Sequence, residues 1–137
     1  MGQRLVISIE TMGEPIAKIY YHWSAYTVSA LYETQQVVKC IYNHEDESKK
    51  ELQLRLIRFC ENNGGGIRGD DYEMKYIQGM FPNETFRTDD YSRNCGLIAI
   101  SEKGMVELQS WSEGDVIINI DEDEINFGVY AGYERFD

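Results

Sequence analysis

The sequence predicts an α+β fold, and three observations lead to this prediction. Short segments rich in β-branched residues lie near both ends of the chain and are separated by turn signals. Two segments with apolar residues at helical spacing lie between them. The length of 137 residues fits a single core, so we expect residues 1–137 to form one domain.

The first expected element is an N-terminal β-hairpin. Its strands are predicted over residues 4–10 (RLVISIE) and 15–21 (PIAKIYY), which are rich in β-branched and aromatic residues. Residues 11–14 (TMGE) between them are a turn signal. Pro15 has no N–H to donate, which suits the first residue of a strand.

A long amphipathic helix is expected next, from Ser24 to about Tyr42, because glycine and proline are absent from this segment. Ser24 or Thr27 is expected to cap its N-terminus. The expected buried stripe consists of Val28, Leu31, Gln35, Val38 and Tyr42, with Ala30, Val37 and Ile41 beside it.

A second amphipathic helix is predicted within residues 43–63. Leu52, Leu56 and Phe59 have helical spacing, and residues 62–66 (NNGGG) are a strong stop signal. Two adjacent helices cannot both bury their apolar faces on one small hairpin, so more sheet or a partner subunit must cover them. A position of the helices in a dimer interface is one of these two ways to cover them.

The remainder of the chain is expected to hold loops and then a sheet. Residues 64–95 are polar and weakly periodic, which is typical of binding loops. A C-terminal antiparallel β-meander is predicted from four strand-like segments with turn signals between them. These segments are residues 96–101, 105–111, 115–120 and 125–133.

Composition limits the partners and the compartment. With 13 basic and 24 acidic residues the net charge is −11, so no bulk field attracts DNA or an anionic membrane. Three cysteines without a CxxC pair indicate neither a disulfide framework nor structural zinc. The sequence lacks a secretory signal and any apolar run of about 18 residues. We expect a cytoplasmic protein.

Signatures of catalysis are missing from the sequence. It contains no GxSxG, P-loop, HExxH or dinucleotide-binding motif. His22 is either a candidate base or a hydrogen-bonded residue where a strand meets a helix, and His44 is expected to be solvated. The acidic run at residues 121–124 lacks EF-hand spacing and is more typical of a solvated turn than of a cation site. We expect no enzyme activity, cofactor or metal.

Signals of ligand binding concentrate in the polar segment. Arg68 closely follows three glycines at 64–66, whose N–H groups are suited to an anionic ligand, although the glycines equally fit a helix stop. Phe81, Phe86 and Tyr91 are candidates to stack on a nucleobase, or to cap the core from a loop.

A second candidate binding pair lies just before the segment GLIAIS. Arg93 supplies a guanidinium that can donate two parallel hydrogen bonds, and Asn94 supplies an amide that both donates and accepts, just before a predicted strand. A salt bridge from Arg93 to Asp89 or Asp90 is the competing interpretation.

Several segments together resemble the phage type-one Thoeris anti-defence proteins. They are the start MGQRLVI, residues 20–33 (YYHWSAYTVSALYE), the helix pair, residues 62–69 (NNGGGIRG) and residues 92–101 (SRNCGLIAIS). The resemblance extends from Met1 to about Gly104. It implies a sponge in the host bacterial cytoplasm that sequesters the immune signal glycocyclic ADP-ribose without cleaving it, so that the Thoeris effector stays inactive.

The resemblance also implies partners and site residues. Members form homodimers, some assembled into hexamers, with ligand in pockets between subunits; hexameric members also bind cyclic di- or trinucleotides of CBASS. The implied ligand-binding residues are Phe81, Phe86, Arg93, Asn94, Arg68, Arg58, His22, Ser24 and Tyr26. Arg4 and Arg135 are candidates for the second, oligonucleotide site. Alanine at Arg68 or Phe81 is expected to weaken capture at least about tenfold with the fold intact.

Two other functional classes remain open from the sequence. One is a nucleotide-degrading enzyme that uses His22 or convergent acidic residues. The other is an acidic mimic of nucleic acid that inhibits a host protein, which the charge of −11 permits.

Overall fold

The structure is a computed structural model, and it describes residues 3–42, 47–89 and 95–128. These residues form four helices and one seven-stranded mixed sheet, which confirms the expected α+β class. The strands are β1 (Leu5–Thr11), β2 (Glu14–Tyr21), β3 (Gly66–Arg68), β4 (Thr88–Asp89), β5 (Leu97–Ala99), β6 (Gly114–Asn119) and β7 (Glu124–Gly128). The helices are α1 (Thr27–Ile41), α2 (Lys49–Asn62), α3 (Asp71–Met80) and α4 (Glu102–Ser110).

The sheet has the strand order β4-β3-β5-β2-β1-β6-β7. β1 and β2 pair in antiparallel fashion around a turn at Met12 and Gly13, as the sequence predicts. β6 pairs in parallel with the other side of β1, and β5 in antiparallel fashion with β2. The N-terminal hairpin is therefore the centre of the sheet.

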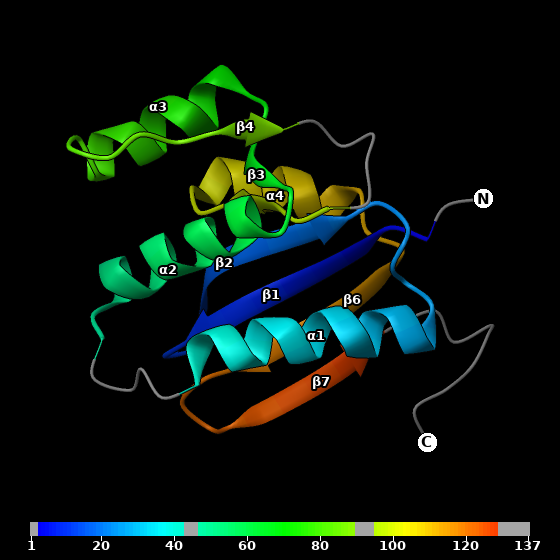
Figure 1. Cartoon of the computed structure of the whole chain (residues 1–137). Helices are drawn as coiled ribbons and strands as arrows, with labels where there is room; N and C mark the ends of the chain where they lie inside the picture. The colour runs from blue at the N-terminus through cyan, green and yellow to red at the C-terminus, as the bar shows by residue number, and fades with distance from the viewer. Residues whose placement is uncertain (1–2, 43–46, 90–94, 129–137) are drawn as a thin grey trace.

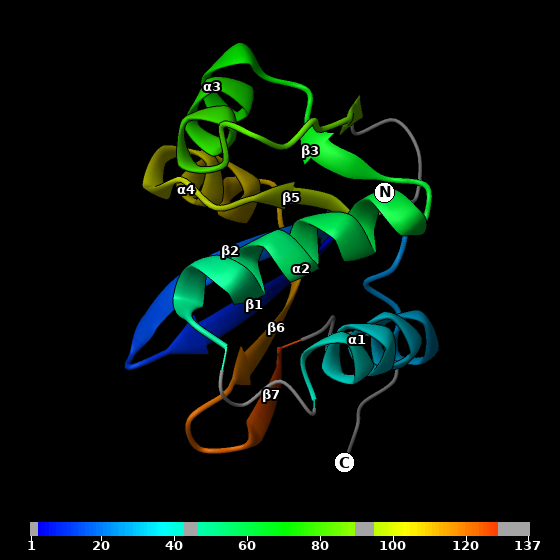
Figure 2. The same cartoon turned by 60° about the vertical axis from the view of Figure 1, so that its left-hand side comes forward.

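Helices cover both faces of the sheet: α1 and α2 lie on one face and α4 on the other (Figures 1 and 2). Because side chains alternate along a strand, Ile7 packs on the α1/α2 side and Val6 on the α4 side. Burial on both faces explains why residues 5–9 are all buried.

The two predicted helices are present, but α1 buries a different face from the one expected. Val28 and Leu31, expected in the core, are 78% and 39% exposed, whereas Ala30 and Val37 are fully buried. Apolar residues occupy neighbouring positions around this helix, so its rotation is decided by packing on the sheet. Its N-cap residue is Tyr26, not Ser24 or Thr27.

The ends of α2 follow local signals. Ser48 and Glu51 form a capping box, in which the Ser48 hydroxyl accepts the Glu51 N–H and the Glu51 carboxylate accepts the Ser48 N–H. The helix ends where the glycine run begins. The observed helix is shorter than the predicted segment of 43–63.

The predicted C-terminal meander is wrong in its second strand, because residues 102–110 form α4. The Ser101 hydroxyl accepts the Gly104 N–H and caps this helix. The helix carries the chain across the sheet, so β6 returns parallel to β1. β5 and β6 lie where strands are predicted, and β7 covers the described part of the last one.

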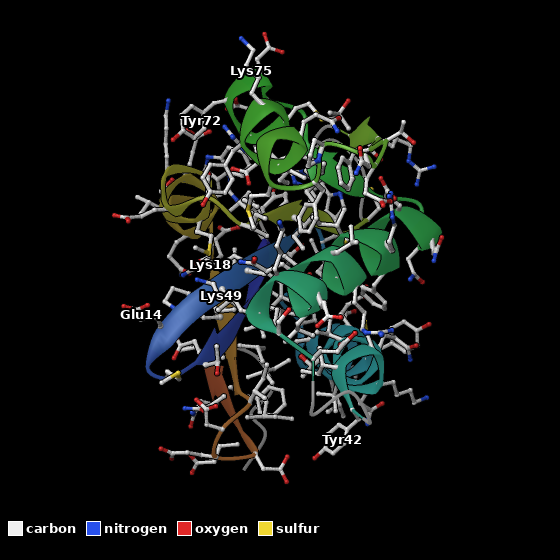
Figure 3. All side chains as sticks on the ribbon, turned by 90° about the vertical axis from the view of Figure 1, so that its left-hand side faces the viewer. Glu14, Lys18, Tyr42, Lys49, Tyr72 and Lys75 are labelled. Carbon is white, nitrogen blue, oxygen red and sulfur yellow. The ribbon has the colours of Figure 1, made fainter. Side chains whose placement is uncertain are left out.

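The predicted loop region contains a helix whose buried carboxylate fixes α4. Glu73 of α3 is fully buried and accepts the N–H groups of Ile100 and Ser101 at 2.8 and 3.0 Å, as well as the Ser101 hydroxyl. A Cβ at Gly104 would lie 2.1 Å from Glu73 Oε1, so a side chain at this position would displace the buried carboxylate. Tyr72 and Lys75 lie on the outer side of α3 (Figure 3).

The described residues contain no helix that combines the length and apolar character needed to cross a membrane. Cys40, Cys60 and Cys95 are free thiols. Burial raises the pKa of the half-buried Cys40 to about 11.

Candidate functional site

Three of the predicted ligand-binding residues lie together beside α2. Phe81 follows α3, and Phe86 lies in the segment before β4; their ring centroids are 6.1 Å apart in an edge arrangement. The Arg58 guanidinium of α2 lies 4.7 Å from the centre of the Phe86 ring. Phe81 is only 7% exposed and belongs to the core, whereas Phe86 is half-buried. Phe86 is therefore the better placed of the two to contact a ligand.

The charge of Arg58 is already balanced by two carboxylates. It lies 2.7 Å from both Glu61 and Glu84, and it also donates to the Thr85 carbonyl. Hydrogen bonding to Glu61, and then to Glu84, raises the pKa of Arg58 above its ordinary value, so the guanidinium stays protonated. An anionic ligand must replace at least one of these carboxylates.

Arg58 also lies on the wall of an open groove of about 620 Å³ between α1 and α2. Arg55 lies on the same wall, Lys39 lies on the α1 side, and Phe59 contributes an apolar surface. Glu47 and Glu51 also line the groove, and Glu47 forms an ion pair with Arg55 at 2.6 Å. The helical spacing of Arg55 and Arg58 was visible in the sequence as a signal for a shared face. The contribution of Lys39 could not be seen in the sequence, because it depends on how α1 packs against α2.

Arg68 lies on the other face of the sheet from Arg58. Ile67 and Arg68 are consecutive in β3, and Ile67 packs in the core beneath α2. The Arg68 side chain is 12% exposed, forms ion pairs with Asp70 at 2.6 Å and with Glu107, and lies 5.4 Å from the Trp111 ring centre. Arg58 and Arg68 of the same chain therefore cannot contact one ligand together.

The glycine run before Arg68 serves the fold. A Cβ on Gly65 would lie 1.9 Å from the Gly96 carbonyl oxygen, so two backbone segments approach too closely for any side chain. The N–H groups of Gly65 and Gly66 donate to the carbonyls of Cys60 and Gly96. The donors that were expected to be offered to a ligand are used within the protein.

His22 lies where β2 leads into α1 and makes a hydrogen bond there. Its Nδ1 is 2.7 Å from the Tyr20 hydroxyl, and its ring lies 4.5 Å from the Trp23 ring. The Tyr20 ring in turn contacts the edge of Trp111 at 5.3 Å. This aromatic series connects His22 to the surroundings of Arg68.

Ser24 and Tyr26 occupy the approach to α1. The Ser24 side chain is fully buried and donates to Glu33 at 3.3 Å. Burial raises the pKa of Glu33, and the Ser24 hydrogen bond opposes this shift. Tyr26 is 45% exposed, and its side chain makes no capping bond. The start of α1 therefore has no side-chain cap from its N-cap residue.

Of the four remaining predicted site residues, the structure describes one. Arg4 precedes β1 and forms an ion pair with Glu113 at 3.0 Å. Arg93, Asn94 and Arg135 lie outside the described residues. No group of three or more His, Cys, Asp or Glu suited to a metal ion occurs in residues 3–42, 47–89 and 95–128.

No protein-family model, curated protein sequence or solved structure matches this chain.

Proposed function

We propose that the protein binds glycocyclic ADP-ribose and holds it intact, so that the effector of the Thoeris system stays inactive. This proposal rests on the resemblance of the sequence segments to the phage anti-defence proteins. Its structural support is the position of Arg58, which lies both on the face of the Phe86 ring and on the wall of the groove between α1 and α2. A nucleotide with a base and a pyrophosphate needs both an aromatic surface and a cation.

Binding at Arg58 requires an exchange of partners. The Glu84 side chain is 43% exposed, whereas that of Glu61 is 14% exposed. Glu84 is therefore the carboxylate that the pyrophosphate displaces, because its charge is easily returned to water. Lys39 adds positive charge along the same groove, whereas Arg55 is ion-paired with Glu47 at 2.6 Å and would have to exchange that partner too. Stacking on Phe86 contributes about 1–3 kcal/mol.

A homodimer, in some assemblies extended to a hexamer, is part of the proposal. The exposed face of α1 carries Val28, Leu31 and Tyr32. The helix itself contains one acidic and one basic residue, Glu33 and Lys39. Two copies can therefore pair through this face without strong repulsion despite a charge of −11 per chain. Enclosure between subunits excludes water and strengthens charge-assisted hydrogen bonds.

A second site for cyclic di- or trinucleotides near Arg4 completes the proposal. There the ligand phosphate would compete with Glu113 for the guanidinium.

The deciding experiment identifies what the protein retains. Purified protein is mixed with glycocyclic ADP-ribose, freed of unbound nucleotide and heat-denatured, and the released compound is identified by chromatography. Intact ligand in near-stoichiometric amount supports a sponge. Altered nucleotide indicates an enzyme and directs attention to His22. A protein that retains nothing refutes the proposed function for this ligand.

Variants around Arg58 test the position of the site. By calorimetry, Arg58→Gln is expected to weaken binding at least about tenfold. Glu84→Gln is expected to strengthen it about threefold or more, because it removes the competing carboxylate. Arg4→Gln, which removes an ion-paired arginine elsewhere, is the matched control and is expected to leave affinity unchanged. Equal affinity in the Arg58 and Arg4 variants removes Arg58 from the site.

A further inference from the structure

A second groove lies at the opposite edge of the sheet from β4. It is bounded by the end of α1, the end of β6 and the start of β7, and has a volume of about 510 Å³. This volume falls within the range of roughly 300–1,000 Å³ that is usual for ligand sites. Its apolar lining consists of Val38, Ile41, Ile118, Ile120 and Ile125. We refer to it as the acidic groove because of the residues at its rim.

The rim of the acidic groove carries three carboxylates, from Asp121, Asp123 and Glu124. Among the described residues, none of the three takes part in a salt bridge. The C-terminal end of α1, at Ile41, adds the negative end of a helix dipole. The groove therefore combines an apolar floor with a negative potential that no described cation neutralises.

The walls of the acidic groove are held in place without an occupant. Asp121 accepts a hydrogen bond from the Thr11 hydroxyl at 2.9 Å and another from the Met12 N–H, which ties the β6–β7 turn to the β1–β2 turn. The Tyr42 hydroxyl donates to Asp123 and ties the same turn to the end of α1. Figure 3 shows Tyr42 on the side of the molecule where the β6–β7 hairpin projects. Little ordering is then needed on binding, which favours affinity.

We propose that the acidic groove docks a short basic segment of a partner protein, in which one aliphatic or aromatic side chain is flanked by Lys or Arg. The apolar side chain fills the floor, and the flanking cations meet Asp123 and Glu124. A second copy of this chain is a poor occupant of this groove. The exposed face of α1 has nearly balanced charge, whereas here three carboxylates would face a chain with a net charge of −11. This docking function is independent of nucleotide capture at Arg58.

The test uses fluorescein-labelled peptides and fluorescence anisotropy at low salt. The probe is Arg-Lys-Leu-Lys-Arg, and the comparison peptides are Arg-Lys-Ser-Lys-Arg and Glu-Glu-Leu-Glu-Glu. The full-length protein is expected to bind the Leu probe at least about fivefold more tightly than the Ser peptide, and not to bind the acidic peptide. Affinity is expected to fall as salt is raised.

Three variants distinguish the contributions of the rim carboxylates, the apolar floor and the overall charge to peptide affinity. The double variant Asp123→Asn/Glu124→Gln removes two rim charges at nearly constant shape; Asn suits the positive φ of 55° at position 123. This variant is expected to bind the Leu probe at least about tenfold more weakly than the parent does. Ile125→Thr is expected to remove the preference for Leu over Ser. The control Glu14→Gln/Asp71→Asn, at two exposed carboxylates outside the groove, removes the same net charge and is expected to change affinity less than about twofold.

Three results of the peptide assay would overturn the proposal. These are no saturable binding of the Leu probe up to about 1 mM, equal affinity for the Leu and Ser peptides, or an equal loss in the rim and control variants. Self-association in sedimentation that the rim variant abolishes, without peptide binding, also overturns it, because the occupant would be a second copy. The rim variant is expected to retain glycocyclic ADP-ribose as the parent does, so the two proposals fail separately. Urea unfolding of each variant confirms its fold.

Discussion

Replacing the buried carboxylate of Glu73 is expected to destabilise the junction of α3 and α4 severely. In Glu73→Ala the N–H groups of Ile100 and Ser101 lose their acceptor while they remain buried. An unsatisfied buried donor costs about 1–3 kcal/mol, so the loss for two is about 2–6 kcal/mol. Against a total stability of about 5–15 kcal/mol, this is a large fraction.

The Glu73 effect is measured by urea unfolding monitored by circular dichroism, with the slope m checked for constancy. Glu73→Gln keeps one acceptor oxygen, so its free energy of unfolding is expected to fall by less, about 1–3 kcal/mol. Lys75→Ala, an exposed change in the same helix, is the control and should stay within about 0.5 kcal/mol. A loss below about 1 kcal/mol in Glu73→Ala would refute the view that these hydrogen bonds fix the start of α4.

Three further predictions follow from burial and ionisation. Phe81→Ala should lower the unfolding free energy by about 3–5 kcal/mol in the same urea assay, because the ring is 7% exposed within the core. Cys40 should react with iodoacetamide at about pH 8 roughly a hundredfold more slowly than an ordinary thiol, since burial raises its pKa to about 11. Partial burial acts to raise the pKa of Asp70, but the Tyr72 N–H and Arg68 outweigh it and lower that pKa. The stability that Asp70 contributes is therefore present above its unfolded pKa of about 3.9 and is lost as pH falls through the lower folded value. Asp70→Asn should flatten the pH dependence of stability below about pH 5 in acid titrations of unfolding.

Each of these three predictions has a result that contradicts it. A loss below about 1 kcal/mol in Phe81→Ala would show that the ring is not a core residue. It would also restore the expectation that this change leaves the fold intact. Alkylation of native Cys40 at the rate of an unfolded control would contradict its raised pKa. Parallel acid profiles of the parent and the Asp70→Asn variant would show that this carboxyl does not stabilise the folded state.

The candidate site could be predicted from the sequence only in its residue types. The seven arginines of this acidic chain suggested phosphate contacts, but Arg4, Arg58 and Arg68 each form an ion pair with at least one carboxylate. Three of the pairs join residues far apart in the chain, namely Arg4 with Glu113, Arg58 with Glu84 and Arg68 with Glu107. Their existence depends on strand order and on which face each strand presents, neither of which a linear pattern records.

The sequence by itself determined the elements whose boundaries depend on near neighbours. The β1–β2 turn and the end of α2 before the glycine run are set within a few residues, so local chemistry suffices. The start of α2 is also local, through the capping box at Ser48, although the predicted segment begins at residue 43. The tertiary structure decided what depends on distant partners. It turned Val28 outward on α1, and it brought the Glu73 carboxylate to Ile100 and Ser101, where it holds the N-cap of the helix formed by residues 102–110. Packing and buried hydrogen bonds outweigh local propensities of less than about 1 kcal/mol per residue, and they exist only once the sheet has formed.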